Sequence, residues 1–225
     1  EWTYHNAELD KLFRYAQPLL PSGIDSLEGL LDHRDPKLLE AFVAASQHAQ
    51  AHGLQVAIEH IRRRKGRTGG VLLWQLNEPW PAISWSIIDY YRRPKPGYHK
   101  VVQVYNPVLL SALYSLNRYR PGDALEIELW GINDLLEPVE GFAEMILDGE
   151  IILRQDVSLP PDSSQTVAHI AHPLDHSPQV LSTRLTARSG DIISTNDYDL
   201  TYHQSPVLSW KDYLISRLAE LTMRW

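Results

Sequence analysis

The stretch GGVLLWQLNEPWPAISWSIIDYYRRPKPGYH, residues 69–99, joins two sequence patterns. Paired glycines lead into the apolar run 71–74, which predicts a short, fully buried strand because it is rich in strand-forming residues. An amide, a carboxylate and several indoles follow, among them Asn77, Glu78 and Trp80. In α/β enzymes, ligands bind in loops at the carboxyl ends of buried strands. The stretch therefore predicts a binding loop behind a buried strand.

The segment before this stretch predicts a long helix over residues 36–64. Asp35 is placed to cap the helix N-terminus, and Pro36 suits the first helical position. Helix, glycine-rich turn and buried strand follow one another in this order in the last repeats of a parallel α/β barrel. A closing helix is expected over residues 94–105. Residues that recur at three- and four-residue steps predict the packing face of the long helix: Leu39, Phe42, Val43, Ser46, Ala49, Gly53, Val56, Ala57 and His60.

Residues 108–204 change to alternating patterns separated by turn signals. Asp148-Gly149 predicts a tight hairpin, and Ser189-Gly190-Asp191 predicts a second turn. Several short strands in about 95 residues predict an immunoglobulin-like β-sandwich. The seven candidate strands are residues 109–116, 124–132, 141–147, 151–158, 165–171, 179–187 and 192–201.

Residues 205–225 predict a C-terminal amphipathic helix, in which Ser209 and Asp212 have the spacing of a capping box. We favour packing of this helix against the rest of the protein, with a partner protein or a membrane surface as the alternative. The expected fold class is α/β plus all-β. Its three parts are the last segment of a (β/α)8 barrel (residues 1–107), the sandwich (108–204) and the helix (205–225).

Composition excludes several classes of partner and site. The formal net charge of -7 argues against nucleic acid, because the single basic run at residues 62–65 is expected at a solvated helix end. Without cysteine, the chain has no disulfides and no thiolate metal sites. No apolar run reaches membrane-spanning length, and no signal peptide opens the sequence, so we expect no membrane association and a cytoplasmic location.

Histidines offer the candidate metal ligands, and neither group of them predicts a site. His48 and His52 are four residues apart on the long helix, but the sequence shows no third ligand near them, so we interpret them as helix-surface residues. His169, His172 and His176 fall in a segment that we interpret as a solvent-exposed loop. We therefore expect neither a metal nor a cofactor.

The run WQLNEPWPAISWSIIDYYRRPKPGYHK, residues 74–100, resembles the end of the catalytic barrel in glycoside hydrolase family 2, in the β-mannosidase branch. That branch shows Trp-Gln-Leu-Asn-Asp, then Trp-Pro, Ser-Trp-Ser, Ile-Asp-Tyr and a Lys-Pro or Lys-Ala. Nearly every element is present in order over about thirty residues, and the resemblance extends weakly over the sandwich. One departure is Glu78, which stands where the branch has aspartate.

The resemblance implies a retaining exo-β-glycosidase that acts on a terminal β-linked sugar, a mannoside. Such hydrolysis needs two carboxyl groups about 5 Å apart. In the family these lie in an Asn-Glu pair and a Ser-Glu-Phe-Gly segment. The flanks of Asn77-Glu78 match the final barrel strand instead, so we expect the nucleophile and the acid/base upstream of Glu1, with the rest of the barrel. The substrate-binding residues implied are Trp74, as the platform under the sugar, with Asn77, Glu78, Trp80 and Trp85.

Four other residues of the stretch, Ser84, Ser86, Asp89 and Tyr90, are expected to be structural. Two alternatives stay open at this point. One is a non-catalytic carbohydrate-binding or scaffold module. The other is an enzyme relative that cleaves β-galactosides, β-glucuronides or β-glucosaminides. The sequence does not predict an oligomeric state.

Overall fold

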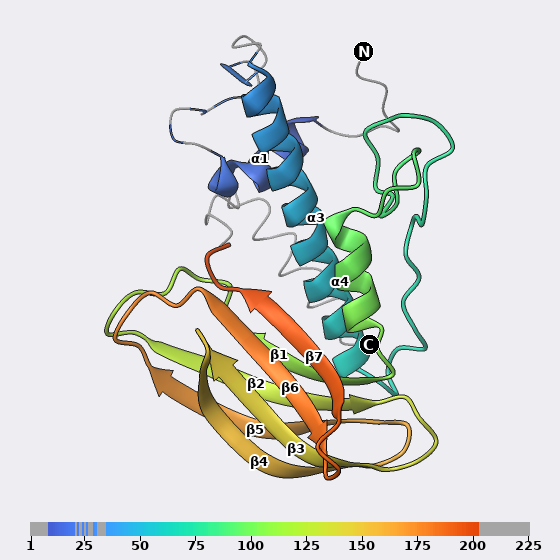
Figure 1. Ribbon diagram of the computed structural model, residues 1–225, viewed down its shortest axis with the longest axis vertical. Coiled ribbons are helices and arrows are strands. Elements are labelled where there is room, and N and C mark those ends of the chain that lie inside the picture. The colour runs from blue at the N-terminus through green and yellow to red at the C-terminus, as the bar shows by residue number, and fades with distance from the viewer. Residues whose placement is uncertain are drawn as a thin grey trace.

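The computed structural model describes residues 9–20, 22, 24, 26, 29–30 and 35–202, which form a helical layer standing on one end of a β-sandwich (Figure 1). The predicted C-terminal helix lies outside these residues. The helices are α1 (Leu9–Ala16), the 3-10 helix η1 (Gln17–Leu19), α3 (Pro36–Arg63) and α4 (Pro96–Val104). The strands are β1 (Val108–Tyr114), β2 (Ala124–Asn133), β3 (Val139–Leu147), β4 (Glu150–Leu159), β5 (Ser163–Pro173), β6 (Val180–Ala187) and β7 (Ile192–Asp199).

The seven strands form two antiparallel sheets, with orders β1-β2-β5 and β4-β3-β6-β7. Their positions confirm the predicted strands to within about two residues at most ends, because one residue in two faces the core and the pattern is visible in the sequence. The core between the sheets is aliphatic, and its fully buried members include Leu125, Leu129, Met145, Leu181 and Leu185.

The hairpin between β3 and β4 turns at Asp148-Gly149, as the sequence predicts. Both residues have positive φ, 47° and 93°, which is the backbone of a two-residue turn that matches strand twist. The turn between β6 and β7 places Gly190 at φ 97°. Glycine and aspartate are therefore required here by backbone conformation.

Two glycines predict opposite responses to the same substitution. A Cβ on Gly141 of β3 would lie 2.1 Å from the carbonyl oxygen of Thr186 on β6, so Gly141→Ala is expected to lower the free energy of unfolding by about 3 kcal/mol. Gly53 is exposed on α3, and a Cβ there would meet no atom within 4 Å, so Gly53→Ala is expected to raise it by about 0.5–1 kcal/mol. Urea unfolding of both variants measures the two effects. Equal changes in the free energy of unfolding for the two variants would contradict the close contact inferred at Gly141.

The long helix α3 begins where predicted. Asp35 Oδ1 accepts a hydrogen bond from the Lys37 amide, and Pro36 is the first helical residue. Its predicted packing face is largely wrong, however, because Leu39, Val43 and Val56 are exposed. The buried face is rotated and partly polar: Phe42, Ala45, Ala51, His52, Gln55, Ile58 and Glu59. Apolar periodicity cannot predict a helix face that is buried through polar pairs.

A buried polar network joins α3 to the sandwich. The Glu59 carboxylate accepts hydrogen bonds from Asn196 Nδ2 at 2.8 Å, from the Tyr198 hydroxyl at 2.9 Å and from Ser111. Arg63 donates to Ser111 at 2.5 Å and lies 3.4 Å from Glu59. We call this set the Glu59 network. A small apolar cluster packs beside it, formed by Ile58, Val104, Leu109 and Ile132.

Residues 71–74 do not form the predicted buried strand. They carry no strand assignment, and Leu72 is 99% exposed. A single extended segment cannot satisfy its backbone hydrogen bonds without neighbouring strands, and the described residues place none beside it. The closing helix, α4, also begins two residues later than predicted. Within the described residues, no helix combines the length and hydropathy needed to cross a bilayer.

Candidate functional site

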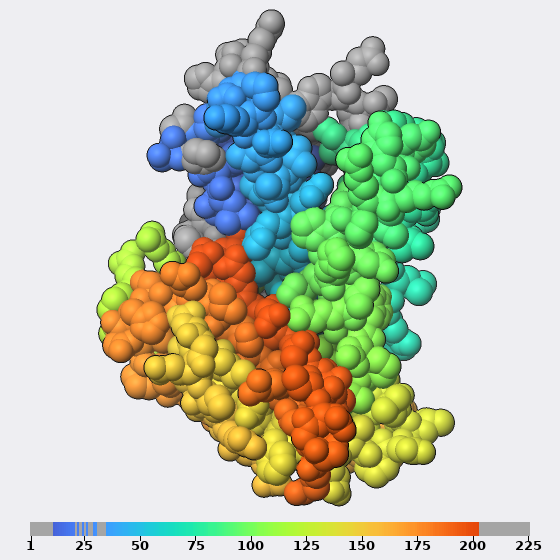
Figure 2. Space-filling view, viewed as in Figure 1, coloured from blue at the N-terminus to red at the C-terminus, as the bar shows by residue number. Residues whose placement is uncertain are grey.

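Residues 74–95, which we call the tryptophan loop, form the candidate site. The loop folds back on itself: the Ile88 amide donates to the Leu76 carbonyl at 2.8 Å, and the Lys95 amide donates to the Ile87 carbonyl at 2.9 Å. Isolated bridges pair Asn77 with Ile88 and Ile88 with Pro94. In Figure 2 the loop, in green, lies at the edge of the helical layer, away from the yellow and orange sandwich. Backbone pairing therefore fixes three short segments side by side.

The inner side of the tryptophan loop is polar as well as buried. Ser86 and Ile87 are buried, and the Lys95 ammonium donates to Ser86 Oγ at 3.1 Å. Glu78 is only 4% exposed. Burial lowers the pKa of Lys95, and the negative charge of Glu78 partly offsets that shift. The base of the loop thus combines a buried carboxylate and a buried serine with a partly buried lysine.

Helix α3 and the residue that follows α4 hold the backbone of the loop and of the segment before it. Gln50 of α3 donates its amide hydrogen to the Trp85 carbonyl at 2.8 Å. The Tyr105 hydroxyl, directly after α4, donates to the Val71 carbonyl at 2.9 Å. Because these are contacts to backbone carbonyls, they set the path of the loop without depending on its side chains. The backbone of the loop is therefore held in place by the helices.

The outer side of the loop carries aromatic rings. Trp74 is 76% exposed, and Trp80 and Trp85 are about half exposed. Asn77 is also exposed. An exposed indole offers an apolar face beside a hydrogen-bonding edge, which is suited to a sugar ring. The arrangement can therefore supply ring faces and one amide to a ligand, while its carboxylate faces inward.

The predicted site residues are thus brought to one loop, on two different sides of it. Trp74, Asn77, Trp80 and Trp85 lie on the outside, and Glu78 lies inside. Two supports of the loop, Lys95 and Gln50, were not predicted from the sequence. Lys95 stands in the Lys-Pro of the motif, which is a usable signal, whereas Gln50 is a helix residue with no local signal at all.

Three of the four residues that were expected to be structural, Ser84, Ser86 and Asp89, make hydrogen bonds within the loop. Ser84 and Ser86 share a hydrogen bond of 2.9 Å, and Asp89 Oδ1 accepts from the Arg93 amide at 2.8 Å. Asp89 closes a tight turn in which Arg92 has φ 63°. Tyr90 differs, because its ring is half exposed and contacts Tyr91 edge-on. A half-exposed ring on a neighbouring exposed ring does little to tie down the loop.

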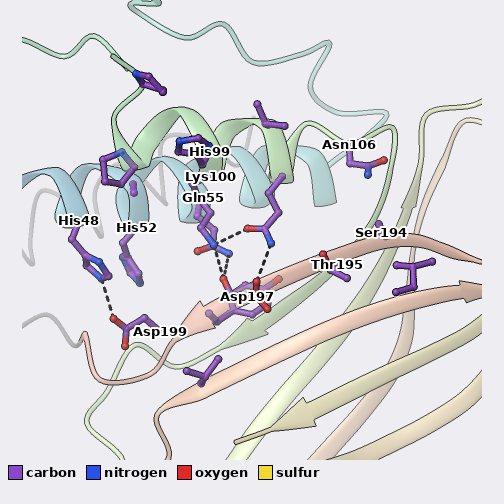
Figure 3. A pocket seen from close by; sticks show the side chains of 18 of the residues that line it. His48, His52, Gln55, His99, Lys100, Asn106, Ser194, Thr195, Asp197 and Asp199 are labelled. Carbon is purple, nitrogen blue, oxygen red and sulfur yellow. Dashed lines mark hydrogen bonds and ion pairs between the residues drawn. The ribbon is translucent and has the colours of Figure 1, made fainter. Parts of the chain in front are cut away.

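A second feature is a cleft of about 1100 Å³ between α3, α4 and β7 (Figure 3). It is lined by His48, His52, Lys100, Asp197 and Asp199, among others. The interpretation of His52 as a helix-surface residue is wrong, since it is only 7% exposed. Asp199, at the end of β7, lies beside His48 of α3, and local sequence could not predict this contact.

The other histidines make simple contacts. His176, in the turn after β5, lies 2.9 Å from Asp148 and 2.5 Å from Asp175, whereas His169 of β5 lies 3.8 Å from Glu128. The segment interpreted as a loop at His169 and His172 is in fact strand β5. Across the described ranges, no three metal-ligating side chains converge closely enough to hold an ion.

Comparison with known proteins finds β-mannosidases among the relatives of this chain. No family model matches the chain. β-Mannosidase B of Aspergillus niger is 34% identical in an alignment of 175 residues, and the match covers 69% of this chain and 21% of that protein. β-Mannosidase B of Emericella nidulans is 34% identical in an alignment of 165 residues, and the match covers 65% of this chain and 20% of that protein. The chain therefore spans about a fifth of the length of the curated relatives that it matches.

Solved structures agree with these relatives. The β-D-mannosidase from Dictyoglomus thermophilum matches with a TM-score of 0.64 and 25% identity over 87% of this chain and 22% of that one. The exo-chitosanase CsxA of Amycolatopsis orientalis shares the fold, with a TM-score of 0.53 and 23% identity over 72% of this chain and 19% of that one. The chain belongs to the β-mannosidase-like proteins of glycoside hydrolase family 2, and it is a C-terminal portion of such a protein.

Proposed function

We propose that the chain supplies part of the sugar pocket of a retaining exo-β-glycosidase that hydrolyses terminal β-mannosides. The observation that carries the proposal is the tryptophan loop, with exposed indoles on an internally braced base. Sugar pockets combine apolar ring contacts with a few fixed polar groups. Trp74 would lie under the sugar at the cleaved bond, with Trp80 and Trp85 along the rim.

Asn77 and Glu78 would act at different depths of this pocket. The exposed Asn77 amide can donate to and accept from sugar hydroxyls directly. Glu78, inside the loop beside Lys95, would orient the binding residues from behind. The extra methylene that Glu78 has over the aspartate of the family is consistent with a carboxylate that reaches inward to Lys95.

The rest of a barrel would complete the pocket. Large apolar side chains on α3, before the loop and at its start are exposed: Leu39, Val43, Val56, Leu72 and Leu76. Soluble domains rarely leave such surfaces uncovered. We propose that preceding barrel repeats cover this surface and pair with residues 71–74, which would then form the buried strand. On this proposal, residues 1–107 end the barrel, residues 108–204 form an immunoglobulin-like sandwich and residues 205–225 add a helix.

The chain alone is expected to hydrolyse an aryl β-mannoside no faster than buffer does. Retaining hydrolysis requires a nucleophile and an acid/base about 5 Å apart, which we assign to earlier barrel strands, and their loss removes most of the rate enhancement. The test compares the chain with the longer protein that contains it, using aryl β-mannosides, β-glucosaminides and β-galactosides.

Preferential cleavage of the β-mannoside by the longer protein supports the proposal. Preference for another sugar would assign a different substrate, and no cleavage by either protein would favour a binding or scaffold module. Turnover by the chain alone that Glu78→Gln abolishes would make Glu78 catalytic and would overturn the division of roles.

A further inference from the structure

Two histidines of α3 meet the end of β7 at one side of the junction between helices and sandwich (Figure 3). His48 Nε2 lies 3.0 Å from Asp199 Oδ2. The buried Tyr202 ring packs edge-on against both imidazoles, with centroid distances of 5.5 Å to His48 and 4.7 Å to His52. The Tyr202 hydroxyl donates to the Tyr15 carbonyl of α1 at 2.9 Å. We call His48, His52, Asp199 and Tyr202 the histidine cluster.

His52 is the member of the histidine cluster that lacks polar compensation. The Nε2 atoms of His48 and His52 are both buried without a hydrogen-bond partner among the described residues, but His48 Nε2 lies within ion-pair distance of Asp199, whereas the described residues offer His52 no such partner. The carboxylate close to it, that of Asp199, is already bound by His48 and by the amide and hydroxyl of Thr201. A proton on His52 would therefore place a buried cation beside His48, and the nearby anion is already engaged.

The elements packed around His52 do not relieve this charge. From α4, the Lys100 ammonium faces the same cleft and donates to the Asp197 carbonyl at 2.7 Å, so it adds positive charge, and the exposed His99 also lines the cleft but offers no negative charge. From β7, the Asp197 carboxylate accepts from Gln103 Nε2 at 3.3 Å. Further along α3, Glu59 is bound within its own network. The described part of α1 contributes the carbonyl of Tyr15, which carries no charge.

Burial, followed by the charge of His48, lowers the pKa of His52 from 6.5 to about 4. Because this pKa is lower when the junction is closed, protons bind preferentially to the open form. Stability of the closed junction is then fully present above about pH 6.5 and decreases as the pH falls toward about 4. Contact with His48 lowers the pKa of Asp199, so its carboxylate stays charged through this range.

We propose that the histidine cluster is an acid-released latch, in which protonation of His52 detaches residues 199–202 from α3. The Glu59 network lies at the other end of the same junction and keeps the sandwich attached. Release would free Tyr202 from α1 and α3 and would widen the cleft between α3, α4 and β7. The latch is a property of this junction and does not depend on the proposed enzymatic activity.

The test follows Tyr202 and Tyr198 by fluorine NMR of chain labelled with 3-fluorotyrosine, with each signal assigned from its Tyr→Phe variant. Both rings are buried at the junction, Tyr202 in the latch and Tyr198 in the Glu59 network. Between pH 7 and 4.5 the opening equilibrium at Tyr202 is expected to rise at least 10-fold, with an upper limit of about 60-fold from the two pKa values. Tyr198 should keep its buried signal.

Replacing His52 by phenylalanine keeps a ring against Tyr202 but removes the titrating group, so it should abolish the change at Tyr202. The matched control is His60→Phe, on the exposed side of the same helix. This variant should show the same pH-dependent change at Tyr202 as the natural chain. Two results would overturn the latch: a change at Tyr202 that persists in His52→Phe, or equal exposure of Tyr198 and Tyr202. If His52→Phe does not fold, the comparison of the two tyrosines in the natural chain still decides the matter.

Discussion

Replacing Trp74 by alanine in the complete enzyme is expected to lower kcat/KM by about 100-fold, roughly 3 kcal/mol of transition-state stabilisation. An indole under the sugar at the cleaved bond would support the distorted ring of the transition state, so kcat should fall as well as affinity. Steady-state kinetics on an aryl β-mannoside measure both constants. Trp74→Phe, which keeps a smaller platform, should lose less.

The melting temperature separates this role from a packing role. Trp74 is 76% exposed in this chain, so its truncation should leave the melting temperature of the chain nearly unchanged. A buried core tryptophan would instead cost about 3–5 kcal/mol of fold stability on truncation. Tyr91→Ala, at another exposed ring of the tryptophan loop, is the matched control and should preserve activity. Normal kinetics with a lowered melting temperature would contradict a binding role for Trp74.

Replacing Glu59 by alanine is expected to destabilise the chain by about 3–5 kcal/mol. Glu59 is 2% exposed, and its carboxylate accepts hydrogen bonds from Asn196, Tyr198 and Ser111. Its removal therefore leaves several buried donors unpaired. It also leaves the nearly buried Arg63 guanidinium without its 3.4 Å counter-charge. Removing one partner of a buried pair is costly because the other charge stays desolvated. Urea unfolding measures the loss.

Two variants calibrate that prediction. Glu40→Ala, at an exposed position of α3, should change the free energy of unfolding by less than about 0.5 kcal/mol. Glu59→Gln keeps the shape and one of the two acceptor oxygens but loses the charge, so its effect should fall between the two. A loss below about 1 kcal/mol for Glu59→Ala would mean that the Glu59 network does not hold the junction.

Local sequence determined the elements of this protein. Alternation along residues such as Leu125, Ile127 and Leu129 predicted the strands, because the side-chain period of a strand is two. Asp148-Gly149 predicted a hairpin, since its backbone conformation suits only a few residue types. Asp35 and Pro36 predicted the start of α3 for the same reason. The motif within residues 74–100 indicated the family, because motif residues are recognisable without their neighbours in space.

Tertiary structure decided which partners these elements meet. Glu59 and Asn196 are 137 residues apart, and no local pattern predicts their hydrogen bond or the polar face that it buries on α3. Likewise, Glu78 is buried although its neighbours Asn77 and Trp80 are exposed, and local sequence does not predict that difference. Residues 71–74 have the composition of a buried strand, but the described part of the chain offers them no strand to pair with. Propensity fixes the conformation a segment prefers, whereas burial and pairing depend on groups brought from elsewhere in the fold.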